Sequence, residues 1–229
     1  MEASLKIQNA RKKHRIYLVE DHPVTRQGFA VLLNREAGLM VCGEAETAAK
    51  ALLEIESSKP DLVIVDIALP GRDGIELIKD IATVHPLLPT LVLSTLDESV
   101  YAKRALKAGA KGYAMKHEPV EQLLMAVRQV LAGEVYLSEA MRKDLLLNSL
   151  HVSSKNTTSG VDALSDRETE VFRLIGEGLG TRHIAKMLGL SISTIESHRT
   201  HIKEKLGVKR APDLVRQAVE WLHNQNFKD

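Results

Sequence analysis

Short apolar runs alternate with longer amphipathic stretches through the first half of this chain. The alternation is typical of repeated strand–helix units that build a parallel sheet, because the runs have strand length and the stretches have helix length. Runs such as Leu62–Val65 lack polar residues, as expected for strands covered on both faces. The pattern predicts an α/β domain with strands near 16–20, 39–45, 61–66, 90–94 and 111–115, and helices near 23–37, 47–58, 73–84, 97–108 and 119–132.

Polar residues stand at the ends of four of these runs: Glu20 and Asp21, Asp66, Ser94, and Lys116. If the runs are parallel strands of one sheet, their ends meet at one edge, so these side chains should share a crevice. Each residue alone is more simply explained as a helix cap or a turn residue. Their conjunction instead predicts a Mg²⁺-dependent site that accepts a phosphoryl group.

The chemistry of that site follows from the residue types. Mg²⁺ prefers oxygen ligands and is usually held by one or two carboxylates plus a phosphate, which Glu20, Asp21 and Asp66 can provide. Asp66 is the candidate nucleophile, because a carboxylate can attack phosphorus once a cation neutralises the charge of the transferring group. Lys116 can pair with one phosphoryl oxygen, and Ser94 can hydrogen-bond another.

Charge is unevenly distributed along the 229 residues, although the net charge is only +1. Residues 16–133 hold 12 Lys and Arg against 16 Asp and Glu, whereas residues 181–216 hold 8 against 3. An acidic first half suits a metal cation, and a basic patch late in the chain suits a polyanion. The single cysteine, Cys42, excludes an internal disulfide and a cysteine-based zinc site, and we interpret it as a small buried apolar residue.

The remaining segments suggest how the chain is divided. Residues 1–14 form a basic arm, and nowhere does an apolar run approach the roughly 20 residues that span a bilayer, so we expect a soluble, cytoplasmic protein without membrane contact. Residues 134–163 are predicted to be a linker, with a short helix near 138–149 and a polar stretch at 153–160. Residues 164–229 then form a second domain.

The second domain is predicted to be all-α, with four helices near 166–177, 181–188, 192–206 and 211–223. Ser165 and Glu168 have the spacing of a capping box at the start of the first helix. The turn Gly189-Leu190-Ser191 has the length that joins the two helices of a helix-turn-helix.

Residues 15–133 resemble the receiver domain of bacterial two-component response regulators. The matching motifs are Val19-Glu20-Asp21-His22, Ile64-Val65-Asp66, Leu69-Pro70-Gly71-Arg72-Asp73-Gly74, Leu93-Ser94 and Gly112-Tyr113-Ala114-Met115-Lys116. The resemblance implies a flavodoxin-like fold in which Asp66 is the phosphoacceptor and the Ala68 carbonyl also binds Mg²⁺. It further implies that Ser94 follows the phosphoryl group and that Tyr113 changes rotamer with it. His117 departs from the family, since many receivers carry proline after the lysine, and it leaves the geometry of that peptide open.

Residues 164–223 resemble the LuxR-type helix-turn-helix of the NarL/FixJ response regulators. The matching stretches are Leu164–Val171, Ile184–Leu188, Ser191–His198 and Ile202–Val208. The resemblance makes 192–206 the recognition helix, with its N-terminal half in the major groove. Ile195, Ile202 and Leu206 share one face at helical spacing and are assigned to the core.

The remaining polar residues of this block are candidate DNA contacts. Glu196, Ser197 and Thr200 occupy positions that resemble the family's base readers, although Glu196 stands where lysine is common and suits cytosine N4. Thr194 is a further candidate DNA contact. Backbone phosphate contacts are expected from Arg182, Arg199, Lys203, Lys205, Lys209 and Arg210, and for any one of them a solvated surface position is equally plausible. Gly180-Thr181-Arg182-His183 also departs from the family pattern. His183, His198, His201 and His223 lack the spacing of metal ligands.

Together these features predict a phosphorylation-controlled regulator of transcription that binds double-stranded DNA. A sensor histidine kinase would donate the phosphoryl group, and the chain would catalyse only its own aspartyl phosphorylation and dephosphorylation. By the resemblance, the unphosphorylated receiver hides helix 192–206, and phosphorylation releases it and promotes a homodimer, for which residues 95–115 are the expected face.

Two alternatives come from other classes of protein. A Mg²⁺-dependent phosphatase would need a substrate pocket and a general acid near Asp66, and neither stands out in the sequence. A passive dimerisation module fused to a DNA-binding domain would ignore phosphate, which the complete set of site residues argues against.

Overall fold

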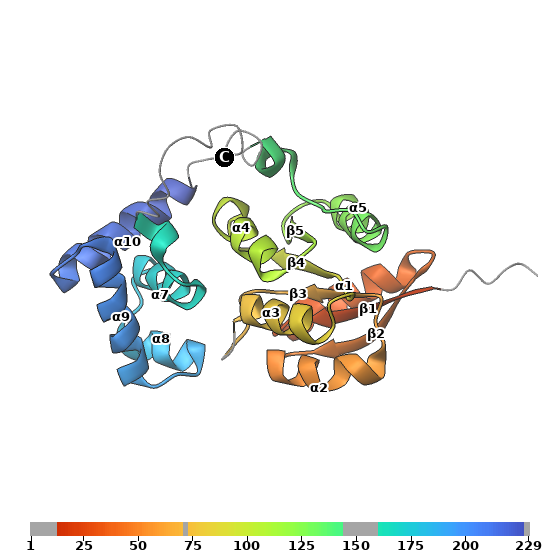
Figure 1. Cartoon of the computed structure of the whole chain (residues 1–229), viewed down its shortest axis with the longest axis horizontal. Coiled ribbons are helices and arrows are strands. Elements are labelled where there is room, and N and C mark those ends of the chain that lie inside the picture. The colour runs from red at the N-terminus through yellow and green to blue at the C-terminus, as the bar shows by residue number, and fades with distance from the viewer. Residues whose placement is uncertain (1–12, 71–72, 144–159, 227–229) are drawn as a thin grey trace, which may run out of the picture.

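The computed structural model describes residues 13–70, 73–143 and 160–226. These residues form an α/β domain and an all-helical domain that lie side by side (Figure 1). The predicted arm, except for Lys13 and His14, and the polar stretch at 153–159 lie outside the described residues. Within the described part of the chain, no helix combines the length and the apolar character needed to cross a membrane.

The first domain contains a single parallel sheet in the order β2-β1-β3-β4-β5. All five predicted strands are present: β1 (His14–Val19), β2 (Leu39–Ala45), β3 (Leu62–Val65), β4 (Thr90–Ser94) and β5 (Gly112–Met115). β1 begins two residues earlier than predicted, because His14 already pairs with Leu39. The flavodoxin-like fold class is confirmed.

Five helices cover the two faces of this sheet: α1 (Pro23–Arg35), α2 (Ala48–Ser58), α3 (Gly74–Val84), α4 (Glu98–Ala108) and α5 (Val120–Leu131). Alternate strand residues point to opposite faces, so Val63 and Val65 join the core under α2, α3 and α4, whereas Leu62 and Ile64 join the core under α1 and α5. This two-sided burial explains why β3 carries no polar residue.

Cys42 lies at an irregularity of the β1–β2 pairing. Ile16 pairs with Val41, but Tyr17 pairs with Gly43, so Cys42 is the extra residue of a bulge. A side chain at Gly43 would collide with the ring of Tyr17, which explains glycine at this position. Cys42 is therefore half-buried against the core rather than fully buried as expected.

Part of the predicted linker belongs to the first domain. Tyr136 forms an isolated bridge with Gly112, and Leu137 and Met141 are buried in the sheet core. A helical segment starts at residue 139, in the region of the predicted helix 138–149, and the described residues stop at 143. The apolar residues at 136, 137 and 141 are what hold this stretch on the sheet.

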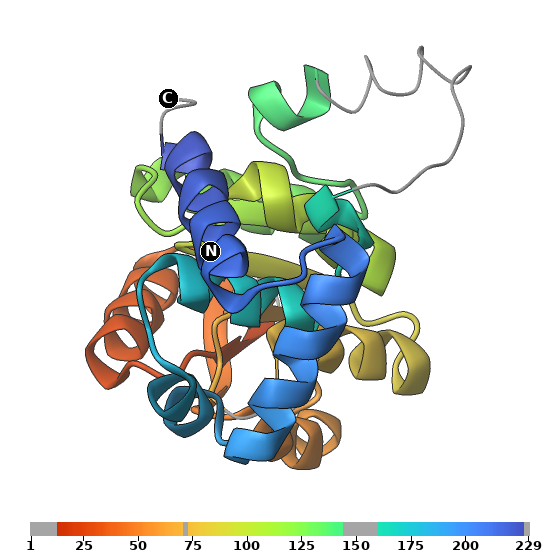
Figure 2. The same ribbon diagram turned by 90° about the vertical axis from the view of Figure 1, so that its left-hand side faces the viewer.

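The second domain has the four predicted helices, preceded by the 3₁₀ turn η1 (Gly160–Ala163): α7 (Asp166–Gly176), α8 (Thr181–Leu188), α9 (Ile192–Leu206) and α10 (Ala211–Asn226). The capping box of Ser165 and Glu168 is formed at the start of α7. The core gathers apolar residues of all four helices, among them Phe172, Ile184, Ile202 and Leu214. Figure 2 shows α9 crossing the exposed side of this domain.

Candidate functional site

Three predicted site residues meet at the carboxyl end of the sheet. Lys116 Nζ lies 2.6 Å from Asp66 Oδ2 and 2.5 Å from Glu20 Oε2. Asp66 and Glu20 are only 3% and 4% exposed. The crevice thus holds two buried carboxylates bridged by one ammonium group.

The backbone fixes these side chains because the strand pairing continues into the site residues. Glu20 N–H donates to the Ala45 carbonyl at 3.0 Å, Asp66 N–H to Val19 at 2.9 Å, and Lys116 N–H to Ser94 at 2.8 Å. Glu20, Asp66 and Lys116 therefore each continue the backbone hydrogen bonding of the sheet by one residue beyond the strand. The convergence that was predicted from the strand ends is present for Glu20, Asp66 and Lys116.

Burial dominates the electrostatics of the crevice. It raises the pKa of Glu20, with a further rise from the negative charge of Asp66, and the bond from Lys116 opposes the rise only partly. Burial by itself would lower the pKa of Lys116, but the charges of Asp66 and Glu20 outweigh it, so the pKa of Lys116 is raised. An additional cation would therefore be stabilised at this acidic edge.

The oxygen donors at this edge suit Mg²⁺. Carboxylate oxygens of Glu20 and Asp21 lie within 4.8 Å of each other and of a ring nitrogen of His22. Asp21 accepts from His22 Nδ1 at 2.9 Å, and Asp66 Oδ1 accepts from the Ala68 N–H at 3.0 Å. Hard carboxylate ligands on two adjacent strands fit the preference of a magnesium ion. His22 was not predicted as a site residue, although it belongs to the motif at the end of β1.

The predicted switch residues, Ser94 and Tyr113, converge on the loop after β4. Ser94 is fully buried, and its hydroxyl oxygen accepts from the Leu96 N–H at 3.2 Å. The Tyr113 hydroxyl donates to the Leu96 carbonyl at 2.7 Å, and burial raises the pKa of Tyr113 well above its usual value. The side chains of Ser94 and Tyr113 therefore bind the amide and the carbonyl group of the same residue, Leu96. Every described peptide bond is trans, including the one between Lys116 and His117.

Helix α9, which was predicted to read DNA, was expected to be hidden by the receiver, and in this structure it is not. Glu196, Ser197 and Thr200 are exposed on α9, because the receiver docks on α7 and η1 instead. Ile195 and Ile202 are buried and Leu206 is half-buried, as predicted for the core face. The Ser191 hydroxyl caps α9 by accepting from the Thr194 N–H.

Several predicted DNA contacts have partners within the protein. Glu196 accepts from the Thr181 hydroxyl at 2.8 Å, and Arg199 lies 4.0 Å from Glu196. Lys205 pairs at 2.5 Å with Glu168 of the capping box, and Arg210 pairs at 2.8 Å with Asp213. Arg182 and Lys209 are exposed, and Lys203 and Thr194 are half-buried. The basic surface around α9 is therefore partly neutralised before any DNA arrives.

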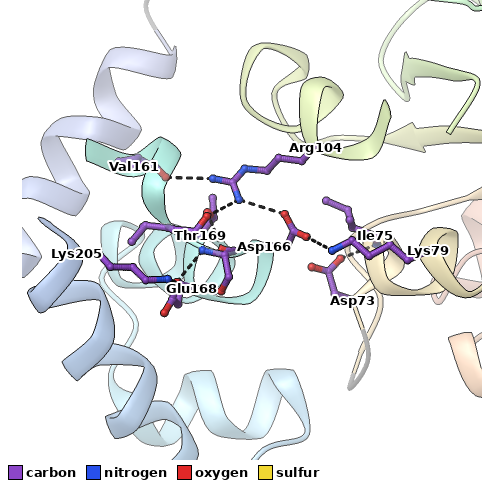
Figure 3. A network of polar contacts seen from close by, with 11 residues as sticks. Asp73, Ile75, Lys79, Arg104, Val161, Asp166, Glu168, Thr169 and Lys205 are labelled. Atoms are coloured by element: carbon purple, nitrogen blue, oxygen red, sulfur yellow. Dashed lines mark hydrogen bonds and ion pairs between the residues drawn. The ribbon is translucent and has the colours of Figure 1, made fainter. Parts of the chain in front are cut away.

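An ionic contact between the domains was not predicted. Asp166, the first residue of α7, accepts from Lys79 of α3 at 2.7 Å and from Arg104 of α4 at 3.1 Å (Figure 3). Arg104 also donates to the carbonyls of Leu164 and Val161 at 2.8 and 3.1 Å. Separate helical patterns contain no signal for this contact, because its partners belong to different domains.

The fold, the crevice and the exposed α9 agree with matches to known proteins. Residues 16–128 match the response regulator receiver domain family, and residues 162–218 match the bacterial regulatory proteins of the luxR family. The chain belongs to the two-component response regulators that act as transcription factors through a LuxR-type DNA-binding domain.

Individual relatives support the same family. The oxygen regulatory protein NreC of Staphylococcus aureus is 36% identical over 210 residues, covering 90% of this chain and 97% of NreC. Among solved structures, the response regulator ChrA of a heme-sensing two-component system has a TM-score of 0.51 at 31% identity and covers 92% of this chain and 98% of its own. RcsB of Salmonella enterica serovar Typhimurium, bound to the promoter rprA with the phosphomimetic BeF₃⁻, has a TM-score of 0.62 at 27% identity, covering 89% and 97%.

Proposed function

We propose that Asp66 accepts a phosphoryl group from a sensor histidine kinase and that this step controls DNA binding by α9. The observation that carries the proposal is the position of Lys116, which holds its ammonium 2.6 Å from the Asp66 carboxylate inside a crevice lined by Glu20. A nucleophile, a fixed cation and acidic metal ligands are the groups that phosphoryl transfer to a carboxylate requires.

In the proposed reaction an oxygen of Asp66 attacks phosphorus while the phosphorus–nitrogen bond of a phosphohistidine breaks. The bonding electrons remain on the histidine nitrogen, which takes up a proton from solvent. Lys116 pairs with a phosphoryl oxygen once that oxygen replaces its present carboxylate partner. Glu20, Asp21, Asp66 and the Ala68 carbonyl would hold Mg²⁺, which neutralises the charge that accumulates on the transferring group.

The switch residues lie where they could sense the product. Ser94 is the last residue of β4, and its hydroxyl is a donor for a phosphoryl oxygen; a rotation of the side chain toward that oxygen would weaken its present bond from Leu96. Tyr113 holds the same loop through the Leu96 carbonyl, so a movement of the loop would free the tyrosine. We propose that this movement reshapes residues 95–115, which would form the face of a homodimer on phosphorylation.

For the DNA-binding domain we propose that α9 enters the major groove with Thr194, Glu196, Ser197 and Thr200 facing base edges. Phosphate contacts are assigned to Arg182, Arg199, Lys203, Lys205, Lys209 and Arg210. The exposure of Glu196, Ser197 and Thr200 supports this orientation. For Lys205 and Arg210, contact with a phosphate would mean exchanging Glu168 and Asp213 for the DNA backbone. Since its partners would be DNA and a kinase domain, we propose a cytoplasmic location.

The experiment that tests the proposal combines Asp66→Ala with acetyl phosphate and Mg²⁺. We expect the wild-type protein to gain one phosphoryl group by intact mass and to bind DNA more tightly, and the variant to do neither. Wild-type protein that takes up no phosphate, or a variant whose DNA affinity still responds to acetyl phosphate, would reject the proposal. Assays with generic phosphoesters separate it from the phosphatase alternative, because a response regulator should not turn them over.

A further inference from the structure

Helix α7 carries a charged stripe in addition to its apolar face. The apolar face packs into the core of its own domain through Val171, Leu174 and Ile175. The stripe follows the spacing i, i+4, i+7 and i+11 and consists of Asp166, Glu170, Arg173 and the C-cap residue Glu177. Such a stripe is normally solvated, yet Glu170 is only 6% exposed, because α7 is the helix that docks on the receiver.

One end of the stripe holds the two domains together. Asp166 binds the ammonium of Lys79 and the guanidinium of Arg104, so α3 and α4 are both tied to the start of α7 (Figure 3). Arg104 is 15% exposed in its side chain and also binds two carbonyls of the segment that leads into α7. Asp166 is therefore the anchor of the closed arrangement.

One turn further along, two acids, Asp73 of the receiver and Glu170 of α7, are both buried. Asp73 of the receiver is 5% exposed and caps α3 by accepting from the Ile75 N–H at 2.9 Å. Burial and then the negative charge of Glu170 raise the pKa of Asp73 to about 7. Burial also raises the pKa of Glu170, against the opposing charges of Arg167 and Arg173, and the charge of Asp66 adds to the rise.

The start of α3, which Asp73 caps, is close to the backbone of Asp66. The residue after Asp73 is Gly74, where a Cβ atom would overlap the backbone oxygen of Asp66 and lie 2.5 Å from Ile67 Cα. The Gly74 N–H donates to the Ile67 carbonyl at 3.2 Å. The start of α3, and Asp73 with it, is thus packed directly on the loop that follows Asp66.

We propose that a phosphoryl group on Asp66 opens the domain interface by repelling Glu170 across it, adding to the repulsion that Asp73 already exerts on Glu170, in addition to any signal carried by Ser94 and Tyr113. The inference rests on the proposed phosphorylation of Asp66. A phosphoryl group adds about −1.5 to −2 charges, and its field is weakly screened at a buried interface. The repulsion acts on the second turn of α7 and opposes the Asp166 anchor on the first.

Arg167 gives the release of Glu170 a route to the DNA-reading helix. Its guanidinium donates to Glu170 at 3.2 Å and to the carbonyl of Leu188 at 3.0 Å. Leu188 is the last residue of α8, directly before the turn that leads into α9. Arg167 would therefore transmit a displacement of Glu170 to the end of α8 and to the turn before α9.

The test compares Glu170→Gln, Asp166→Asn and the control Glu177→Gln in the full chain. Glu177 lies on the same stripe but at the far end from Asp166, and it pairs with Arg173. Domain separation is measured by small-angle X-ray scattering with and without acetyl phosphate and Mg²⁺, and phosphoryl uptake by intact mass. DNA affinity is measured in the same samples.

We expect wild type and Glu177→Gln to open on phosphorylation and to gain about tenfold in DNA affinity. Glu170→Gln should take up phosphate normally and remain closed, and its DNA affinity should rise at most about threefold. Asp166→Asn should be open before phosphorylation. A phosphorylated Glu170→Gln that opens like wild type would overturn the inference alone, whereas failure of the wild-type protein to take up phosphate would overturn the proposed function as well.

Discussion

The ammonium of Lys116 lies 2.6 Å from the carboxylate of Asp66, although the two residues are 50 positions apart in the sequence. Lys116 also binds Glu20 at 2.5 Å, so one positive charge is shared between two buried carboxylates. If Asp66 is the phosphoacceptor, as we propose, this arrangement keeps the ammonium where a phosphoryl oxygen would arrive.

Replacing Lys116 by methionine should therefore destabilise the receiver and prevent phosphorylation. Removing one partner of a buried ion pair costs about 3–5 kcal/mol, because the remaining charges stay buried without compensation. Burial already raises the pKa of Glu20, so protonation of Glu20 relieves the penalty as the pH falls toward the ordinary carboxyl range. Urea unfolding at pH 7.5 and pH 5 should show a smaller loss at pH 5, and an equal loss at both would contradict the explanation.

Gly74→Ala should displace the phosphoacceptor loop. The added methyl group would overlap the backbone of Asp66 and Ile67, and neither can move without disturbing the site. We expect a loss of stability of about 1–3 kcal/mol and slower phosphoryl uptake. Gly28→Ala is the matched control: Gly28 lies within α1 with open space around its Cβ position, so alanine there should be neutral or stabilising by up to about 1 kcal/mol. Equal effects of the two substitutions would reject this explanation.

The domain interface should weaken as the pH rises. The pKa of Asp73 is raised to about 7 in the closed arrangement, so the closed form gains most when this carboxyl is protonated. Its contribution is complete below the ordinary carboxyl pKa and is lost progressively as the pH rises through about 7. Glu170 and Asp166 of α7 face this carboxyl and strengthen the trend, and Arg167 opposes it.

The measurement is the scattering profile of the unphosphorylated protein between pH 6 and pH 8. We expect a more open average at pH 8 in the wild type. Asp73→Asn should flatten the dependence, because asparagine caps a helix as well as aspartate does but does not ionise. An unchanged pH dependence in Asp73→Asn would assign the titration to other groups.

Two residues of the DNA-binding domain should have separable effects on binding. Lys203→Ala should weaken binding to all DNA sequences and reduce the slope of log K against log salt by about one, as expected for a lost phosphate contact. Glu196→Ala should instead alter sequence preference, since glutamate can accept from cytosine, and should free the Thr181 hydroxyl. Titrations at several salt concentrations with two DNA sequences distinguish these results, and a salt slope unchanged by Lys203→Ala would remove it from the phosphate contacts.

The strands and the crevice could be predicted because their signals are local. Uninterrupted apolar runs define β3 and β4, and the position of Asp66 at the end of one run places it at the edge where Lys116 also lies. The capping box at Ser165 was predictable for the same reason, since both partners lie within one helical turn.

The domain contact could not be predicted, because its residues carry no distinctive local pattern. Asp166, Glu170 and Arg173 have the spacing of an ordinary solvated helix face, yet in the structure Asp166 binds the receiver and Glu170 is buried. The same docking explains why the expected masking of α9 was wrong: the receiver contacts the opposite part of the helical domain. Similarly, the attachment of residues 136–141 to the sheet depends on a few apolar side chains within an otherwise weak pattern.

The closed arrangement leaves Glu196, Ser197 and Thr200 in solvent while Asp166 and Glu170 are engaged elsewhere on the domain. If α9 reads DNA and Asp166 and Glu170 carry the response, as proposed, the choice of target gene and the response to the signal depend on different helices. Substitutions in α9 would then change which DNA sequences the protein binds without altering its response to phosphorylation. The same separation would allow the DNA-contacting residues to be exchanged by design.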